Sequence, residues 1–301
     1  MNTQPWRWRL RDATLELSRD PDRRLDAVDP DGRMATVSCG AALHHVRVAL
    51  AVRGYEVAVR RLSDTGDRLA VVGVTGPAPP SPSACEMAAA IRHRHSDRRP
   101  IAATSRVDDD VIAVLDSAAG NEGCKLFRIG DAERAFLGAA VDQAQRSERD
   151  DPAYRRELAA WTTHRPPGAG VSFESLVAAV PRPVAVRDFA GDGETGLFPG
   201  FGDDRFADYL VLGAPADTAL DQLRAGEATS AVWLTATARG LATSVMSDVL
   251  EVPSTRAAVG RLLAGRAEPQ LVIRTGIQGH PVPPPATSRR ALGEVLDEGP
   301  P

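Results

Sequence analysis

The stretches GAALHHVRVALAVRGY (Gly40–Tyr55) and GEATSAVWLTATARGL (Gly226–Leu241) share one frame. Both open with Gly-x-Ala, carry Val at the seventh position and close with Arg-Gly and a large apolar residue. Helices commonly end at glycine, so each stretch predicts a helix. We expect the first over about Cys39–Arg53 with Ser38 as its N-cap. The second, Ala225–Arg239, is more apolar all round, so we expect it to be the buried, central one.

Two further pairs of segments recur in the same order. An apolar run ending in Thr-Gly follows each helix, at Leu69–Gly76 and Gln270–Gly276. A segment beginning with Asn precedes each helix, namely NTQPWRWRL (Asn2–Leu10) and NEGCKLFRI (Asn121–Ile129). This recurrence predicts a duplicated unit of roughly 100 residues. Two copies of one unit pack most simply about a pseudo-twofold axis, and a ligand site is then expected where they meet.

The second copy is the longer one. Between its Asn and Gly landmarks the first copy has 38 residues and the second has 105. The excess predicts an insertion at about 130–223, with a Gly/Pro-rich run at Gly191–Asp204 as a candidate lid. We divide the chain into a first half, residues 1–80, and a second half, residues 83–301, intertwined as one globular unit. The Pro-rich stretch Pro77–Pro82 links them.

Composition limits the function classes. The 301 residues are 43% hydrophobic and 25% charged, as in ordinary globular proteins, and the net charge of -4 favours no nucleic-acid partner. No apolar run approaches the roughly 18 residues of a membrane helix, and no secretory signal follows Met1. The cysteines Cys39, Cys85 and Cys124 are too far apart for a disulfide framework or a metal site. We therefore expect a cytoplasmic protein without a metal.

The basic cluster RHSDR at Arg94–Arg98 is the sharpest chemical signal. An arginine guanidinium can donate two parallel hydrogen bonds to a phosphate, and a serine hydroxyl adds a further donor. On composition alone the cluster is equally well a solvated charge run. The second signal, TSRRAL at Thr287–Leu292, would by itself be a surface turn, but in a pseudo-symmetric chain it could supply a second arm to the same phosphate.

Two other patterns point less clearly to a site. Gly191–Gly196 fits the GxGxxG pattern, but LFPGFG follows it, and a dinucleotide loop must open a helix. His44-His45 and His93-x-His95 lack Cys or carboxylate partners at metal-ligand spacing, so a structural or phosphate-side role is favoured.

Taken together, the NTQPW segment, the RHSDR cluster, Gly240-Leu241 with the following loop, and the C-terminal Ser-Arg-Arg resemble the FMN-dependent nitroreductase family. The duplication, the CGAAL helix and the long insertion resemble its actinobacterial Acg branch, in which one chain holds two nitroreductase-like halves. The resemblance covers nearly the whole chain. It implies an α+β fold, with a central antiparallel sheet flanked by helices.

The resemblance also implies residue roles. The basic motif would bind the FMN phosphate and the ring edge, the C-terminal arginines would grip the phosphate, Asn2 would close the site, and the loop Ser244–Asp248 would lie beside the redox edge. The implied cofactor-binding residues are Asn2, Arg94, His95, Ser96, Arg98, Ser244, Met246, Ser247, Arg289 and Arg290. The second copy reads NEGCK in place of Asn-x-Gln-Pro-Trp, which implies one FMN per chain. The family's Pro-Ser-x-x-Asn lead-in is missing, because the chain begins one residue before Asn2.

The implied function is an oxidoreductase that passes hydride from NAD(P)H through FMN to a small acceptor such as a quinone or nitroaromatic. No side chain need act as a catalytic acid or base, and a monomer that mimics a dimer is expected. The alternative is a flavin-sequestering or storage protein whose FMN is closed under a lid. A third possibility is a structural or regulatory protein without flavin.

Overall fold

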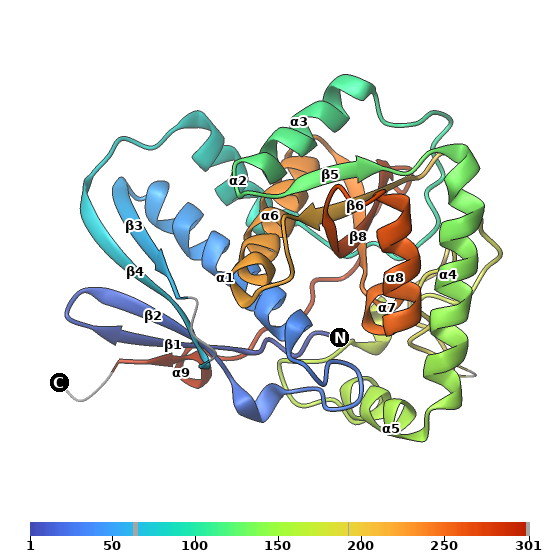
Figure 1. The fold of residues 1–301 in the computed structure, drawn as a ribbon, viewed down its shortest axis with the longest axis horizontal. Coiled ribbons are helices and arrows are strands. Elements are labelled where there is room, and N and C mark those ends of the chain that lie inside the picture. The colour runs from blue at the N-terminus through green and yellow to red at the C-terminus, as the bar shows by residue number, and fades with distance from the viewer. Residues whose placement is uncertain (63–65, 192, 299–301) are drawn as a thin grey trace.

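Figure 1 shows the computed structural model, which describes residues 1–62, 66–191 and 193–298. Asp192, within the expected lid run, and residues 299–301 of the second half lie outside the described residues. The strands are β1 (Trp6–Arg11), β2 (Thr14–Arg19), β3 (Tyr55–Arg61), β4 (Arg68–Pro77), β5 (Lys125–Arg128), β6 (Asp208–Ala214), β7 (Leu241–Met246), β8 (Glu268–Ile277) and β9 (Leu296–Asp297). The helices are α1 (Arg33–Ala51), α2 (Pro82–His93), α3 (Asp109–Gly120), α4 (Asp131–Asp150), α5 (Pro152–Trp161), α6 (Ala219–Ala238), α7 (Asp248–Glu251), α8 (Pro253–Leu262) and α9 (Leu292–Val295), with 3-10 turns η1 (Pro21–Arg23) and η2 (Phe173–Ser175).

Two sheets of matching order form the framework. The first runs β3-β4-β2-β1-β9 and the second β5-β6-β8-β7, so each half orders its strands third, fourth, second, first. All pairs are antiparallel except β1 with β9. The expected α+β class with antiparallel sheet and flanking helices is confirmed, with two sheets instead of a single central sheet. Strand β9, from the second half, joins the sheet of the first half. The matching order is what a duplication would produce; the duplication itself stays a prediction.

Helices α1 and α6 cross at the centre of the molecule, side by side in Figure 1. A Cβ added at Gly226 would lie 1.9 Å from the carbonyl oxygen of Val37, and one at Gly40 would lie 2.0 Å from that of Leu223. Only glycine permits so close an approach of two backbones. Gly40 and Gly226 are the residues that open the two copies of the sequence repeat, so matched positions meet at the crossing. The expected burial of α6 is confirmed, since most of its residues are buried.

The start of α1 differs from the sequence prediction. The helix begins at Arg33, because the Asp29 carboxylate accepts hydrogen bonds from the backbone N–H groups of Met34 (2.9 Å) and Ala35 (2.8 Å). This carboxylate satisfies donors that the first helical turn leaves free. Ser38 is therefore not an N-cap; it lies inside the helix, where its hydroxyl donates to the Met34 carbonyl at 2.8 Å.

Apolar side chains cover both faces of the second sheet. Every residue of β6 is buried, and alternate residues face opposite sides. Tyr209 and Val211 pack toward α4, α7 and α8, whereas Leu210 and Leu212 pack toward α3 and α6. The first sheet packs one face on α1. The facing sides of α1 and α6 are thus held between two rigid layers.

The insertion joins β5 to β6 and contains α4, α5 and η2. In the first half, the same connection is a tight turn at Asp12 and Ala13, which have positive φ values of 45° and 63°. The range expected for the insertion, about 130–223, therefore includes β6 and the start of α6, which match β2 and α1 of the first half. Within the described residues, no helix combines the length and apolarity that crossing a membrane requires.

Candidate functional site

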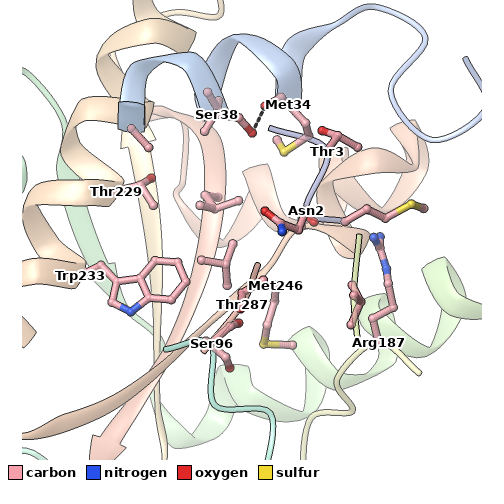
Figure 2. A pocket seen from close by; sticks show the side chains of 18 of the residues that line it. Asn2, Thr3, Met34, Ser38, Ser96, Arg187, Thr229, Trp233, Met246 and Thr287 are labelled. Carbon is pink, nitrogen blue, oxygen red and sulfur yellow. Dashed lines mark hydrogen bonds between the residues drawn. The ribbon is translucent and has the colours of Figure 1, made fainter. Parts of the chain in front are cut away.

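A cavity of about 480 Å³ lies where the two halves meet. Along α1 its lining residues run from Met34 to His45, about 16 Å at 1.5 Å per residue. Figure 2 shows that Ser38 of α1 and Thr229 and Trp233 of α6 face this space, together with side chains from the insertion and the C-terminal segment. The cavity is therefore elongated and bounded by both halves.

The structure brings together nine of the ten residues that the sequence suggested. The lining includes Asn2, Arg94, His95, Ser96, Arg98, Ser244, Met246, Ser247 and Arg289. Arg290 does not line the cavity, which corrects its expected role. Its guanidinium donates to the Asp20 carboxylate at 2.9 Å and to the Gln4 carbonyl at 3.2 Å, so it fastens the C-terminal segment to the first half.

One end of the cavity is cationic. Arg94 directly follows α2, and its guanidinium carbon lies 5.2 Å from the centroid of the Trp233 ring. Its Nε is buried without a hydrogen-bond partner, and burial together with Arg289 lowers its pKa to about 10. Burial and, next, Arg94 lower the pKa of His45 to about 3, so this imidazole is neutral. Within the described ranges neither arginine has a carboxylate partner, so this end suits an anion.

Arg98 supplies a further cation. The neighbouring Asp97 carboxylate pairs with Arg99 at 2.7 Å instead of with Arg98. The Arg98 guanidinium carbon lies 4.6 Å from the centroid of the Phe189 ring. Burial and then Arg187 lower the pKa of Arg98 to about 10, which still leaves it charged near neutral pH. Arg98 can therefore donate hydrogen bonds to a polar group in the cavity.

The loop after β7 forms part of one wall. Met246 is only 2% exposed yet lines the cavity, and Figure 2 shows its side chain near Ser96. The Ser244 hydroxyl accepts a hydrogen bond from Arg274 Nε at 3.0 Å, so it is already engaged by a residue of the neighbouring strand β8. Ser247 stands at the start of α7 and makes no side-chain capping bond. This wall combines a thioether with hydroxyl groups.

A buried acidic cluster surrounds Arg187, near the end of the insertion. Its Nη2 donates to Glu148 at 2.9 Å and to Glu251. Burial raises the pKa of Glu148 to about 7, against the opposing effect of Arg187. Asp248 lines the cavity, and its Oδ1 is buried without a partner. Three carboxylates around one guanidinium favour retention of a proton within the cluster.

The insertion contributes to the cavity through its middle part. Gly170, Val171, Ser175, Val186, Arg187 and Phe189 line it. The N–H of Gly170 donates to the carbonyl of Asn2 at 2.9 Å. The Asn2 side chain donates to the Ser288 carbonyl at 3.2 Å. None of the described residues of the expected lid run, Gly191–Asp204, lines the cavity. The covering segment therefore precedes the Gly/Pro-rich run.

The two histidines of the first pair, His44 and His45, have different neighbours. His44 Nδ1 lies 2.9 Å from Ser230 Oγ, and His45 adjoins Arg94. In the part of the chain that the structure describes, no cluster of three His, Cys, Asp or Glu side chains has an arrangement that could hold a metal ion.

The cofactor-binding residues expected from the sequence did not include several lining side chains: Arg23, His45, Arg187, Phe189 and Trp233. Helical spacing could have found two of them. Ser38, Ala41 and His45 share one face of α1, and Thr229 and Trp233 share one of α6. Arg187 and Phe189 lie in an irregular part of the insertion, where no periodicity signals their direction.

The chain is similar to known proteins over nearly its whole length. No protein-family model matches the chain. It is 39% identical over 303 residues to the protein named "Putative NAD(P)H nitroreductase Rv3131" of Mycobacterium tuberculosis H37Rv, covering 98% of this chain and 86% of that protein. It is 36% identical over 301 residues to "Putative NAD(P)H nitroreductase acg" of the same strain, covering 98% and 90%. Among solved structures, an FMN-bound nitroreductase from Bacteroides fragilis aligns with a TM-score of 0.43 and 12% identity, over 69% of this chain and 96% of that one. One from Desulfitobacterium hafniense aligns with a TM-score of 0.40 and 13% identity, over 67% and 93%.

Proposed function

Since the chain belongs to the nitroreductase family of its mycobacterial relatives, we propose that its cavity binds one FMN and that the protein is an NAD(P)H-dependent oxidoreductase. The observation that carries the proposal is the cationic end of the cavity. Two arginines, Arg94 and Arg289, converge there without an acidic partner among the described residues, and Arg94 Nε is buried and unpaired. A phosphate dianion would satisfy both.

The remaining walls fit the other parts of the cofactor. A flat, largely apolar ring suits the space between Met246 and the side chains of α1 and α6, and Arg98 would donate to its polar edge. Asn2 would close the site through its contacts with Gly170 and Ser288. When bound, FMN would supply the hydride chemistry between a nicotinamide dinucleotide and a small acceptor such as a quinone or nitroaromatic.

The chain's own contribution would be binding, orientation and exclusion of water. Arg94 and Arg289 hold the phosphate, and Arg98 favours negative charge at the ring edge. Residues 170–189 limit access of solvent. The buried cluster of Arg187, Glu148 and Glu251 fixes this wall against α4 and α7. The role requires no side chain as nucleophile or general base.

We also propose that the chain is a duplicated unit with halves at residues 1–80 and 83–301, acting as a monomer that mimics a dimer. The equal strand orders and the crossing of matched glycines support this proposal. A cytoplasmic location is part of the same proposal, supported by three free cysteines. Size-exclusion chromatography with light scattering tests the state of assembly: a single 32.0 kDa species is expected, and a stable dimer would contradict it.

A flavin-sequestering role is the second candidate, favoured by the wall that residues 170–189 add to the cavity. The two roles differ in turnover. In the oxidoreductase, NAD(P)H should bleach the visible absorbance of the bound flavin, and adding a quinone should restore it. This cycle should be repeatable. A sequestering protein should stay coloured, or should bleach once without reducing the acceptor.

Substitutions test the cofactor site itself. Arg94→Ala and Arg289→Ala should each weaken FMN binding by about 1.5–3 kcal/mol, the range for hydrogen bonds to charged groups. Arg11→Ala is the matched control, because Arg11 is exposed and does not line the cavity. Quenching of flavin fluorescence measures the affinity. If both cavity variants bind FMN as the parent does, the phosphate site lies elsewhere.

A further inference from the structure

Among the described residues, a further cation without a carboxylate partner lines the same cavity, besides Arg94, Arg289 and Arg98. Arg23, the last residue of η1, lines the cavity next to Leu25. Its guanidinium carbon lies 5.6 Å from the ring centroid of Trp161, the last residue of α5 in the insertion. Trp161 is 9% exposed, so the ring forms a firm support for the guanidinium.

Arg23 differs from the arginines around it. Arg7 pairs with Asp20 and Asp22, Arg19 with Asp67, and Arg24 with Asp26. In the described part of the chain Arg23 has no such partner and no side-chain hydrogen bond, and its Nη1 is buried without an acceptor. A buried, unsatisfied donor is costly, so this cation is poised for an anionic group from a ligand.

Hydrogen bonds hold the segment that follows Arg23 against α5 and the start of α1. The N–H of Val28 donates to Glu157 of α5 at 2.8 Å, and Asp29 accepts hydrogen bonds from the first turn of α1. His45, which adjoins Arg94 and Arg289, lies on α1 about 16 Å beyond Met34, the lining residue near the start of this helix. The cavity therefore carries a cation at Arg23 besides Arg94, Arg289 and Arg98, to which the proposed function assigns the phosphate and the polar ring edge of FMN.

We propose that Arg23, supported by Trp161, binds a phosphate group of the nicotinamide dinucleotide. This inference rests on the proposed function, because that function assigns Arg94, Arg289 and Arg98 to FMN. The dinucleotide offers two sources of the required charge: the diphosphate, which NADH and NADPH share, and the 2′-phosphate of NADPH alone. Arginine binds either through paired N–H groups.

Equilibrium binding to the FMN-loaded protein tests the proposal without turnover. NAD⁺ and NADP⁺ are titrated by calorimetry into the parent, Arg23→Gln and Arg23→Lys. The control is Arg24→Gln, because Arg24 is exposed, pairs with Asp26 and does not line the cavity. Arg23→Gln should weaken dinucleotide binding by about ten- to a hundredfold. Arg23→Lys should restore part of it, and Arg24→Gln should match the parent.

The two dinucleotides identify the phosphate. Loss confined to NADP⁺ supports the 2′-phosphate, and equal loss for both supports the diphosphate. Unchanged affinity for both in Arg23→Gln, with FMN still bound, overturns the inference and leaves the proposed function intact. Loss of FMN in Arg23→Gln but not in Arg23→Lys also overturns it, because Arg23 would then hold the flavin. Failure of the parent to bind FMN is a separate result that removes the proposed function.

Discussion

The crossing of α1 and α6 should fail if one of its glycines acquires a methyl group. In Gly226→Ala the new Cβ would lie 1.9 Å from the carbonyl oxygen of Val37 and 2.8 Å from the Cα of Gly40. Both obstacles are backbone atoms, which cannot rotate away as a side chain does. The helices must therefore move apart, and the layers that hold them must follow.

The magnitude follows from two opposing terms. Overpacking a tight core costs typically about 1–3 kcal/mol, and clashes with backbone favour the upper end. Alanine recovers about 1 kcal/mol through its better helix propensity. The net loss is about 2 kcal/mol, which lowers Tm by about 4–8 °C at the scale for large domains. FMN affinity should fall too, because both helices line the cavity.

Gly120→Ala is the matched control. Gly120 ends α3, is exposed, and a Cβ there would meet nothing within 4 Å. Thermal unfolding followed by circular dichroism, without ligand, compares the two variants with the parent. We expect Gly226→Ala to unfold at a lower temperature and Gly120→Ala at the parent's temperature or above. A Gly226→Ala variant as stable as the parent would refute the reasoning about the close crossing.

Three other substitutions or treatments follow from the structure. Asp204→Asn should destabilise the protein by about 3–5 kcal/mol in denaturant unfolding, because the fully buried Asp204 carboxylate binds Arg274 at 2.5 Å. A variant as stable as the parent would count against a structural role for this ion pair. Burial raises the pKa of Glu148 from 4.5 to about 7, so the folded state holds its proton more tightly and the parent should lose stability as pH rises from about 5 to 7. Glu148→Gln should flatten that slope in melts across this pH range, and an unchanged slope would contradict the assignment. A thiol reagent should label only the exposed Cys85 in the folded protein, because Cys39 and Cys124 are buried and burial raises the pKa of Cys124 to about 12. After unfolding it should label all three cysteines. Labelling of more than one thiol in the folded protein would be inconsistent with the structure.

The order of elements could be predicted from the sequence where local signals were strong. The two Gly-x-Ala stretches are helices, and the RHSDR cluster lies at a helix end beside the cavity, as Arg94 shows. The start of α1 could not be predicted from Ser38, because a carboxylate nine residues upstream, that of Asp29, supplies the cap. Such a cap depends on how the preceding turn folds.

Other parts of the site depend on contacts across long sequence distances. Arg187 meets Glu148 and Glu251 from three separate elements, and Arg23 meets Trp161 only because the insertion folds back on the first half. No local pattern encodes these meetings. The glycines of the expected lid run suggested an exposed, moving cover, yet the cavity wall comes from an earlier part of the insertion that carries no comparable signal.

The central claim is that the cationic end of the cavity holds the phosphate of FMN. The most direct test compares the dissociation constants of FMN and riboflavin, which differ only in that phosphate, for the parent and Arg94→Ala. We predict that the parent prefers FMN by about a hundredfold or more and that Arg94→Ala loses at least about tenfold of this preference, while its affinity for riboflavin hardly changes. Equal affinities of the parent for FMN and riboflavin would contradict the account.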